Sequence, residues 1–299
     1  MADRGVVVTD RQGELAAVYD AVRPRLIRIA YAILGSHAEA EDVVADCWIR
    51  LVESDRKESV ADVEAWSTVV VSRAALDTLR SARRRREEYV GPWLPEPVVT
   101  HATLDDPADR VTLDDQVSYA LLVVLETLSP AERTVWVLHD LFGMPFPEVA
   151  ETVGRTPAAV RQLATRARAH VAAGAPRVTV TAAQHDSAVR GFLSAALEGD
   201  MAACLAALDP DVVLTSDGGG KVSAARRPIV GADKVMRFLF GILATRVAAN
   251  ELTPIAVNGR LAVAAVRDGR VDSVISLTLD GDRITRVDIV RAPDKLPAP

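Results

Sequence analysis

The spacing of apolar residues changes along this chain from a helical pattern to a strand pattern. This change restricts the chain to folds that combine helical domains with a β-sheet. Over residues 12–90 and 114–173, apolar side chains recur at helical spacing without a strand pattern. Residues 184–299 instead predict two or three helices followed by short strands. The strand-like runs lie at 211–215, 252–257, 260–266, 271–279 and 283–290. The fold class is therefore multidomain, with two all-α domains followed by an α+β domain.

Local signals predict where several of these elements begin and end. In the first block, Pro24 predicts a kink or a division of the helix over 15–35. Gly35 ends that helix, and Ser36 with Glu39 predicts a capping box for the next one. Dipeptides that favour tight hairpin turns separate the last runs, so the last domain should contain an antiparallel meander. These dipeptides are Asn258-Gly259, Asp268-Gly269 and Asp280-Gly281.

Two segments read as linkers. Residues 91–113 contain four prolines, a glycine and an acidic cluster, which favour an extended connection. The second segment, GAPRVTVTAAQ, leads into the last domain. We therefore expect domains at 12–90, 114–173 and 184–299, with 91–113 as the first linker.

Charge and cysteine content exclude several classes of protein. The net charge of −6 is unlike that of a uniformly basic nucleic-acid binder, but four arginines are contiguous at 83–86. Residues 155–170 carry four more arginines and no acid, so local basic patches remain available for phosphates. The two cysteines lack metal-ligand spacing, and we expect neither a metal nor another cofactor. Without a signal peptide or a membrane-spanning run, we expect a cytoplasmic protein.

The clearest motif lies at residues 144–171, MPFPEVAETVGRTPAAVRQLATRARAHV, and predicts a helix-turn-helix. Gly154 supplies the turn, and Thr156 caps a helix that begins at Pro157. Val160, Leu163 and Ala167 should face the core. The outward residues are candidates for reading DNA in the major groove: Arg155, Thr156, Ala158, Arg161, Gln162, Thr165, Arg166 and Arg168. An αα-hairpin with a solvated basic face is the alternative for this motif alone.

The helix-turn-helix and the residues before it closely resemble the C-terminal, promoter-binding domain of bacterial sigma factors. The resemblance runs through Leu128, Pro130, Glu132-Arg133, Leu138, Phe142-Gly143, Glu148, Ala150, Gly154 and Arg166-Ala167-Arg168. Ala40-Glu41-Asp42-Val43-Val44 and Ala65-Trp66, with the arginine series that follows, resemble the other sigma domain of the extracytoplasmic-function group. Two such domains in this order are much more specific than either motif alone.

The resemblance implies a role for each motif. The outward residues of the helix at Pro157 would read the −35 promoter element. Core polymerase would be bound through Glu41, Asp42, Val43, Asp46 and Trp48. The −10 element would be bound through Trp66, Arg73, Asp77, Arg80, Arg83, Arg84, Arg85 and Arg86. For residues 83–86 alone, a solvated basic helix end that suits the helix dipole is the alternative.

Three further motifs resemble the SigJ-like subgroup of this family, which carries a fused SnoaL-like (nuclear-transport-factor-two-like) domain. They are Trp93–Pro97 (WLPEP), Asp217–Lys221 (DGGGK) and Pro293–Leu296 (PDKL). The resemblance implies a cone-shaped α+β domain that regulates the sigma domains in cis. The residues of this regulatory contact would be Trp93, Leu94, Pro95, Glu96, Pro97, Asp217, Gly218, Gly219, Gly220, Lys221, Asp294 and Lys295.

The function indicated is that of a sigma factor, which directs the RNA polymerase core to promoter DNA and is not an enzyme. A SnoaL-like cyclase or isomerase fused to a DNA-binding unit is one alternative, and a stand-alone helix-turn-helix regulator is another. For acid–base chemistry, Asp217, His185 and Asp288 are available, although a loop of three glycines need not hold Asp217 in a fixed position. A small-molecule ligand of the last domain is left open.

Overall fold

The computed structural model describes residues 4–87, 89, 91–100, 117–246 and 251–297. Two compact units are formed, and each combines distant stretches of sequence. Residues up to 84 and 125–173 form the first unit, and residues 85–124 and 174–299 form the second. The segment that follows the first sigma-like block thus packs with the C-terminal part of the chain. None of the described helices is long and apolar enough to cross a membrane.

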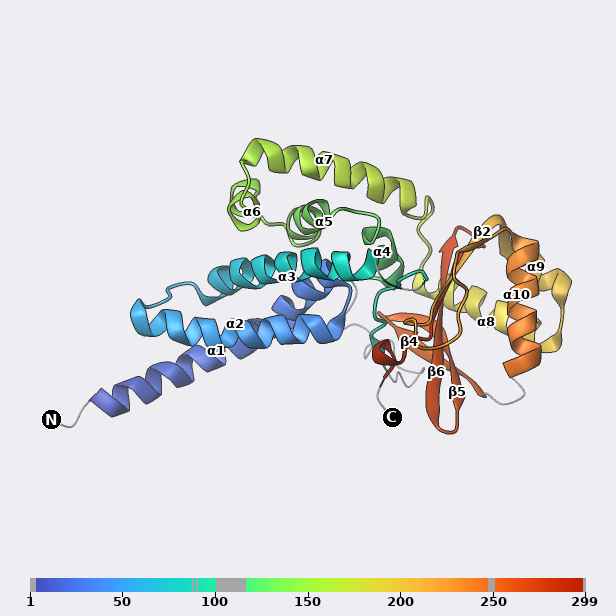
Figure 1. Cartoon of the computed structure of the whole chain (residues 1–299), viewed down its shortest axis with the longest axis horizontal. Coiled ribbons are helices and arrows are strands. Elements are labelled where there is room, and N and C mark those ends of the chain that lie inside the picture. Colours follow the sequence, from blue (N-terminus) through green and yellow to red (C-terminus); the bar gives the residue numbers. More distant parts are fainter. Residues whose placement is uncertain (1–3, 88, 90, 101–116, 247–250, 298–299) are drawn as a thin grey trace. The chain divides into compact units, whose positions relative to one another are not determined.

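The first unit is helical, as its apolar spacing predicts (Figure 1). Its elements are α1 (Arg4–Leu34), α2 (His37–Lys57), α3 (Val63–Glu87), α5 (Pro130–Trp136), the π turn η2 (Val137–Leu141), α6 (Phe146–Val153) and α7 (Pro157–Gly174). A further helix, α4 (Tyr119–Leu125), lies almost entirely in the second unit.

Helix α1 continues through Pro24, so the predicted division of this helix is wrong. Leu26 and Ile29, two and five residues after the proline, are completely buried, and their packing outweighs the lost backbone hydrogen bond. The helix ends before Gly35, whose φ of 72° is one that L side chains rarely adopt. The Ser36 hydroxyl then accepts a hydrogen bond from the Glu39 amide at 3.3 Å, which confirms Ser36 as the cap of α2.

The second unit is built on a curved seven-stranded sheet with the order β1-β4-β5-β6-β7-β2-β3. The strands are β1 (Val99–Thr100), β2 (Leu208–Asp217), β3 (Ile229–Val230), β4 (Glu251–Val257), β5 (Arg260–Arg267), β6 (Arg270–Asp280) and β7 (Arg283–Val290). All neighbouring strands are antiparallel except β2 and β7. The predicted meander is confirmed in β4 to β7. Asn258-Gly259 and Asp268-Gly269 form the first two turns, whereas the third turn is Gly281-Asp282, one residue later than predicted, because Asp280 is the last residue of β6.

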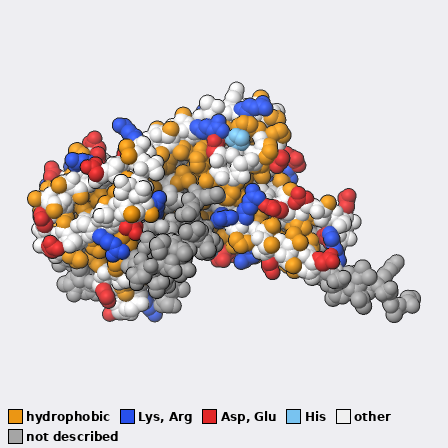
Figure 2. Space-filling view, turned by 180° about the vertical axis from the view of Figure 1, so that it is seen from behind, with side chains coloured by type: hydrophobic (Ala, Val, Ile, Leu, Met, Phe, Trp, Pro, Cys, Tyr) orange, Lys and Arg blue, Asp and Glu red, His pale blue; other side chains and the backbone are white. Residues whose placement is uncertain are grey.

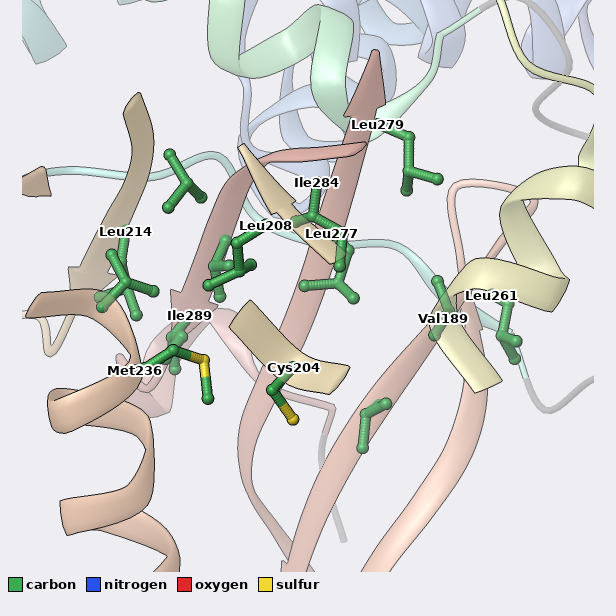
Figure 3. Close-up of a cluster of buried hydrophobic side chains, with 14 residues drawn as sticks. Val189, Cys204, Leu208, Leu214, Met236, Leu261, Leu277, Leu279, Ile284 and Ile289 are labelled. Atoms are coloured by element: carbon green, nitrogen blue, oxygen red, sulfur yellow. The ribbon is translucent and has the colours of Figure 1, made fainter. Parts of the chain in front are cut away.

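Each face of the sheet has its own apolar cluster. One face packs against α8 (Ala182–Glu198), α9 (Met201–Ala207) and α10 (Ala232–Arg246). Figure 3 shows side chains from all three helices, Val189, Cys204 and Met236, pointing into this cluster. On the opposite face, Leu94 and Tyr119 pack against the alternate side chains of the same strands. The segment containing Leu94 is therefore part of the core of this unit.

Charged side chains are mixed over the face shown in Figure 2, where basic and acidic residues alternate with apolar ones. The chain as a whole has a net charge of −6. Binding of phosphates must therefore depend on individual groups of arginines rather than on the field of the whole chain.

Candidate nucleic-acid interface and linker cluster

The helix-turn-helix forms as the sequence predicts. Helix α6 ends at Gly154, which has a φ of 65°, and α7 begins at Pro157. The Ala159 amide donates a hydrogen bond to the Thr156 hydroxyl at 3.3 Å, which confirms the cap. Three α7 side chains are fully buried: Val160, Ala164 and Ala167. Leu163 is only half-buried, so Ala164 takes the place that we predicted for it in the core.

All eight candidate −35 residues lie on the exposed surface of the turn and of α7. They are Arg155, Thr156, Ala158, Arg161, Gln162, Thr165, Arg166 and Arg168. The two C-terminal arginines form ion pairs within the same unit: Arg166 Nε lies 3.3 Å from Glu132, and Arg168 Nε lies 2.5 Å from Asp140. The Arg161 guanidinium lies 5.7 Å from the centroid of the Phe146 ring, nearer the start of the helix.

The candidate −10 residues follow one side of α3. Arg73, Asp77, Arg80 and Arg83 are exposed at helical spacing, and Trp66 is half-buried. The side chains of Arg84, Arg85 and Arg86 lie outside the described part of the structure. Arg80 pairs with Asp77 at 3.1 Å. The other two arginines donate to backbone carbonyls of the helix-turn-helix block: Arg73 to Glu151 at 3.0 Å and Arg83 to Leu128 at 2.8 Å.

The candidate polymerase-binding residues on α2 are not all presented to solvent. Glu41, Asp42 and Asp46 are exposed, and Glu41 lies 3.6 Å from His37. Trp48 is half-buried against the Tyr19 ring, with 5.2 Å between centroids. Val43 was predicted as a contact, but it is only 9% exposed and packs in the helical core, so its side chain is not available to a partner.

One buried arginine of the first unit has a structural role that the sequence analysis did not predict. Arg133 is 1% exposed, and its Nε donates to the Ala32 carbonyl at 2.9 Å. Its Nη1 also pairs with Glu126. Because Arg133 lies on α5 and Ala32 on α1, this side chain joins the two helical blocks of the unit.

In the second unit, the Asp217 carboxylate is completely buried at the end of β2, and four donors surround it. Oδ1 accepts from the Tyr89 hydroxyl at 2.6 Å and the Gly219 amide at 2.9 Å. Oδ2 accepts from the Leu94 amide at 2.9 Å and Lys295 Nζ at 2.7 Å. The expectation that this carboxylate need not be fixed is wrong, because the side chain is held by donors from three segments of the chain.

Lys295 completes this linker cluster, which we define as Tyr89, Trp93, Leu94, Asp217 and Lys295. Its Nζ donates to the Leu94 carbonyl at 2.6 Å and lies 3.9 Å from the centroid of the Trp93 ring. A cation over an aromatic face is stabilised by the ring quadrupole. The WLPEP and PDKL motifs are thus brought together at Asp217.

The remaining residues predicted for the regulatory contact lie outside the linker cluster as defined here. Pro95 and Pro97 are buried and Glu96 is half-buried, and the Tyr119 hydroxyl donates to the Pro95 carbonyl at 3.0 Å. The exposed Lys221 pairs with Asp294 of the PDKL motif at 2.5 Å. A Cβ at Gly218 would clash with the Val222 carbonyl oxygen, and Gly219 and Gly220 have φ near 70°. The three glycines therefore allow the chain to turn sharply beside Asp217.

The other two candidates for acid–base chemistry have different neighbours. His185 Nε2 lies 3.1 Å from the Leu277 carbonyl oxygen. Asp288 accepts a hydrogen bond from Arg286 Nη2 at 2.9 Å, and complete burial raises the pKa of this carboxyl although Arg286 opposes the shift. Among the residues that the structure describes, no group of three or more His, Cys, Asp or Glu side chains could hold a metal ion.

Both helical blocks match known protein families. The family described as Sigma-70 region 2 matches residues 18–85, and Sigma-70, region 4 matches residues 118–171. The ECF RNA polymerase sigma factor SigJ of Mycobacterium tuberculosis is 43% identical over 226 residues, which cover 75% of this chain and 72% of SigJ. The chain belongs to the extracytoplasmic-function sigma factor family. The probable sigma factor SigI of the same organism is 34% identical over 285 residues, which cover 94% of each chain.

The similarity extends to the third domain of this sigma factor. The crystal structure of Mycobacterium tuberculosis SigJ matches with a TM-score of 0.75 and 36% identity, covering 94% of this chain and 97% of that one. The predicted fold class, two all-α sigma domains followed by an α+β domain, is therefore confirmed. The prediction of a sigma factor is also confirmed, and the alternative of a stand-alone helix-turn-helix regulator is wrong. Sigma factors act with RNA polymerase core at promoter DNA.

Proposed function

We propose that the two sigma domains divide promoter recognition between α7 and α3, and that the acids of α2 bind the polymerase core. The exposed face of α7 supports a reading of the −35 element, because Arg161 and Gln162 lie within its first turns. On α3, the −10 element would be bound by Trp66, Arg73 and the other candidate residues that follow them along the helix. On α2, Asp42 and Asp46 form an exposed acidic pair one helical turn apart.

We also propose that the second unit, called the C-terminal unit from here on, regulates these sigma domains in cis through the linker cluster. The observation that carries this proposal is the buried Asp217, which binds both Tyr89 and Leu94 within a few residues of the end of α3. The position of the chain between the two sigma domains therefore depends on contacts with β2 and with the PDKL motif. A change in these contacts is expected to alter promoter use.

Run-off transcription with sigma-free polymerase core tests both proposals. The unmodified chain should give a promoter-dependent transcript, and D42K/D46K should give none and should no longer co-purify with the core. Trp93→Ala or Lys221→Glu should change the amount of transcript several-fold in either direction, with little change in melting temperature. Lys234→Glu, an exposed lysine of α10, is the matched control. If both Trp93→Ala and Lys221→Glu transcribe like the parent, regulation through the cluster is wrong.

A second candidate role, binding of a small molecule by the C-terminal unit, is favoured by its cavities. One cavity of about 250 Å³ lies between the sheet, α8 and α10 and is lined mainly by apolar side chains, among them Phe192, Met236 and Phe240. Pockets with mainly apolar walls and a few polar groups are typical binding sites. Its polar end contains Arg291, which pairs with Asp272 at 3.1 Å, so its charge is already compensated.

A further inference from the structure

The apolar cavity between the sheet, α8 and α10 has a polar end, formed by two serines and an ion pair. These residues are Ser216, Ser273, Asp272 and Arg291. Within the described structure, the hydroxyls of the two serines form no hydrogen bond, and they are not enclosed as the unpaired Ser276 hydroxyl is. The Asp272 and Arg291 side chains are 24% and 11% exposed. A molecule in the cavity can therefore reach these polar groups.

An irregularity in the sheet turns Asp272 into the cavity. Strands β5 and β6 pair at Ala265 and Ser273 and then at Val266 and Val271, so Asp272 is left without a partner on β5. Such a bulge changes the direction of the side chains beside it. Asp272 and Ser273 consequently both line the cavity, although they are neighbours along the strand.

The other two groups come from the adjoining strands. Ser216 of β2 pairs with Ile289 of β7, and Arg291 follows two positions later on the same face of the sheet. Arg291 Nη2 lies 3.1 Å from the Asp272 carboxylate, and Nη1 donates to the Ser223 carbonyl. The ion pair is thus held in place at one end of the cavity.

The charges at this end favour a neutral ligand. A carboxylate would be desolvated beside Asp272 without an uncompensated cation to receive it, and an ammonium group would meet Arg291. In the described structure Arg291 is the one donor to the Asp272 carboxylate, which therefore has lone pairs left for a ligand. The two serine hydroxyls can donate or accept. A ligand hydroxyl can use both kinds of partner, whereas an ether or a ketone can only accept.

We infer that this cavity binds an uncharged apolar alcohol. The ligand hydroxyl would donate to the Asp272 carboxylate and accept from a serine hydroxyl. The hydrocarbon part would lie along side chains such as Val189, Met236 and Ile289, which Figure 3 shows between the helices and the sheet. The inference rests on the small-molecule role proposed above and adds the chemical class of the ligand.

Calorimetric titration of the full chain at neutral pH tests this class. The probe is 1-octanol, with its isomer 1-methoxyheptane, which cannot donate, and octanoate, which is charged. We expect 1-octanol to bind at least about tenfold more tightly than either, because the ether displaces water from Asp272 without replacing its hydrogen bond and octanoate adds a second negative charge there. Equal binding of 1-octanol and 1-methoxyheptane, or tighter binding of octanoate, would overturn the inference but leave the small-molecule role standing. No binding of any of the three at millimolar concentration would overturn both.

Variants locate the binding and test the charge argument. Asp272→Asn leaves Arg291 uncompensated, so octanoate should gain at least about tenfold in affinity relative to 1-octanol. Asp282→Asn, which makes the same charge change at an exposed position of the β6–β7 turn, is the matched control and should keep the order of the parent. S216A/S273A removes only two hydroxyls and should weaken binding of 1-octanol by about tenfold. An unchanged order of ligands in Asp272→Asn, or parental affinity for 1-octanol in S216A/S273A, would overturn the inference.

Discussion

Asp217 is the residue on which the linker cluster depends. It is fully buried, and its partner Lys295 is 13% exposed, so neither charge is well solvated. Removing one partner of a buried ion pair leaves the other uncompensated, which typically costs roughly 3–5 kcal/mol. We expect Asp217→Asn to lower the free energy of unfolding of the C-terminal unit by an amount of this order, measured by chemical denaturation.

A matched control lies in the adjoining motif. Asp294 pairs with Lys221 at 2.5 Å, but the two side chains are 70% and 58% exposed. Exposed ion pairs contribute only ~0–1 kcal/mol, so Asp294→Asn should leave the unfolding midpoint almost unchanged. Equal effects of Asp217→Asn and Asp294→Asn would contradict the structural role given to the buried carboxylate.

His185 should make the stability of the C-terminal unit depend on pH. Burial, with a contribution from Arg260, lowers the pKa of His185 in the folded chain against the opposing effects of the Leu277 carbonyl and of Asp186. Below the unfolded-state value of about 6.5, the unfolded chain binds a proton that the folded chain does not, so the free energy of unfolding decreases as pH falls. Urea midpoints at about pH 7.5 and about pH 5.5 should differ for the parent and differ less for His185→Gln. His170→Gln, on the exposed face of α7, should behave like the parent.

Individual residues also show where a sequence is informative. Gly154 and Thr156 act within a few residues of their own positions, so their roles in the turn could be predicted. Asp217 was recognised as part of a motif, but its donors Tyr89 and Leu94 lie 128 and 123 positions away. Tyr89 was missed completely, because no local pattern distinguishes a tyrosine that donates to a distant carboxylate.

Among the elements, α7 carries the most direct prediction about DNA. Arg161 lies one turn from the cap, where side chains reach base edges, and a good bidentate contact is worth ~1–3 kcal/mol of discrimination. Arg161→Ala should therefore weaken binding to the preferred promoter and relax its sequence preference. Arg168→Ala should weaken binding to all sequences alike, because phosphate contacts carry no sequence information. Binding measured over a randomised −35 library distinguishes the two, and an unchanged preference in Arg161→Ala would contradict the assignment of α7.

Elements differ in how far their sequence defines them. The hairpins of β4 to β7 were predictable because each depends on its own turn dipeptide. The two-residue strands β1 and β3 were missed, since so short a pairing is determined by the neighbouring strand. Pro24 left a kink or a division of α1 open, and the structure contradicts only the division, because burial of the flanking residues against other helices overrides the local preference.

At the scale of the whole molecule, the helical unit holds its two sigma domains together through arginines that promoter binding would also need. Arg73 and Arg83, both candidates for the −10 element, donate to backbone carbonyls of the helix-turn-helix block. The buried Arg133 adds a third link, to the Ala32 carbonyl. The N–H that is bonded to a carbonyl is not available to DNA, so we expect full use of these two arginines at the −10 element to require the first two contacts to open.

We therefore expect a covalent link between residues 73 and 151 to prevent transcription. The variant R73C/E151C would be treated with a reducible bifunctional thiol reagent, and the two native cysteines are buried and should not react. Run-off transcription should be lost after cross-linking and recovered when the link is reduced, because only the open unit presents α3 to the promoter. Each single-cysteine variant, treated in the same way, controls for modification and for loss of Arg73 itself. Full transcription by the cross-linked chain would show that the sigma domains read the promoter without separating at this contact.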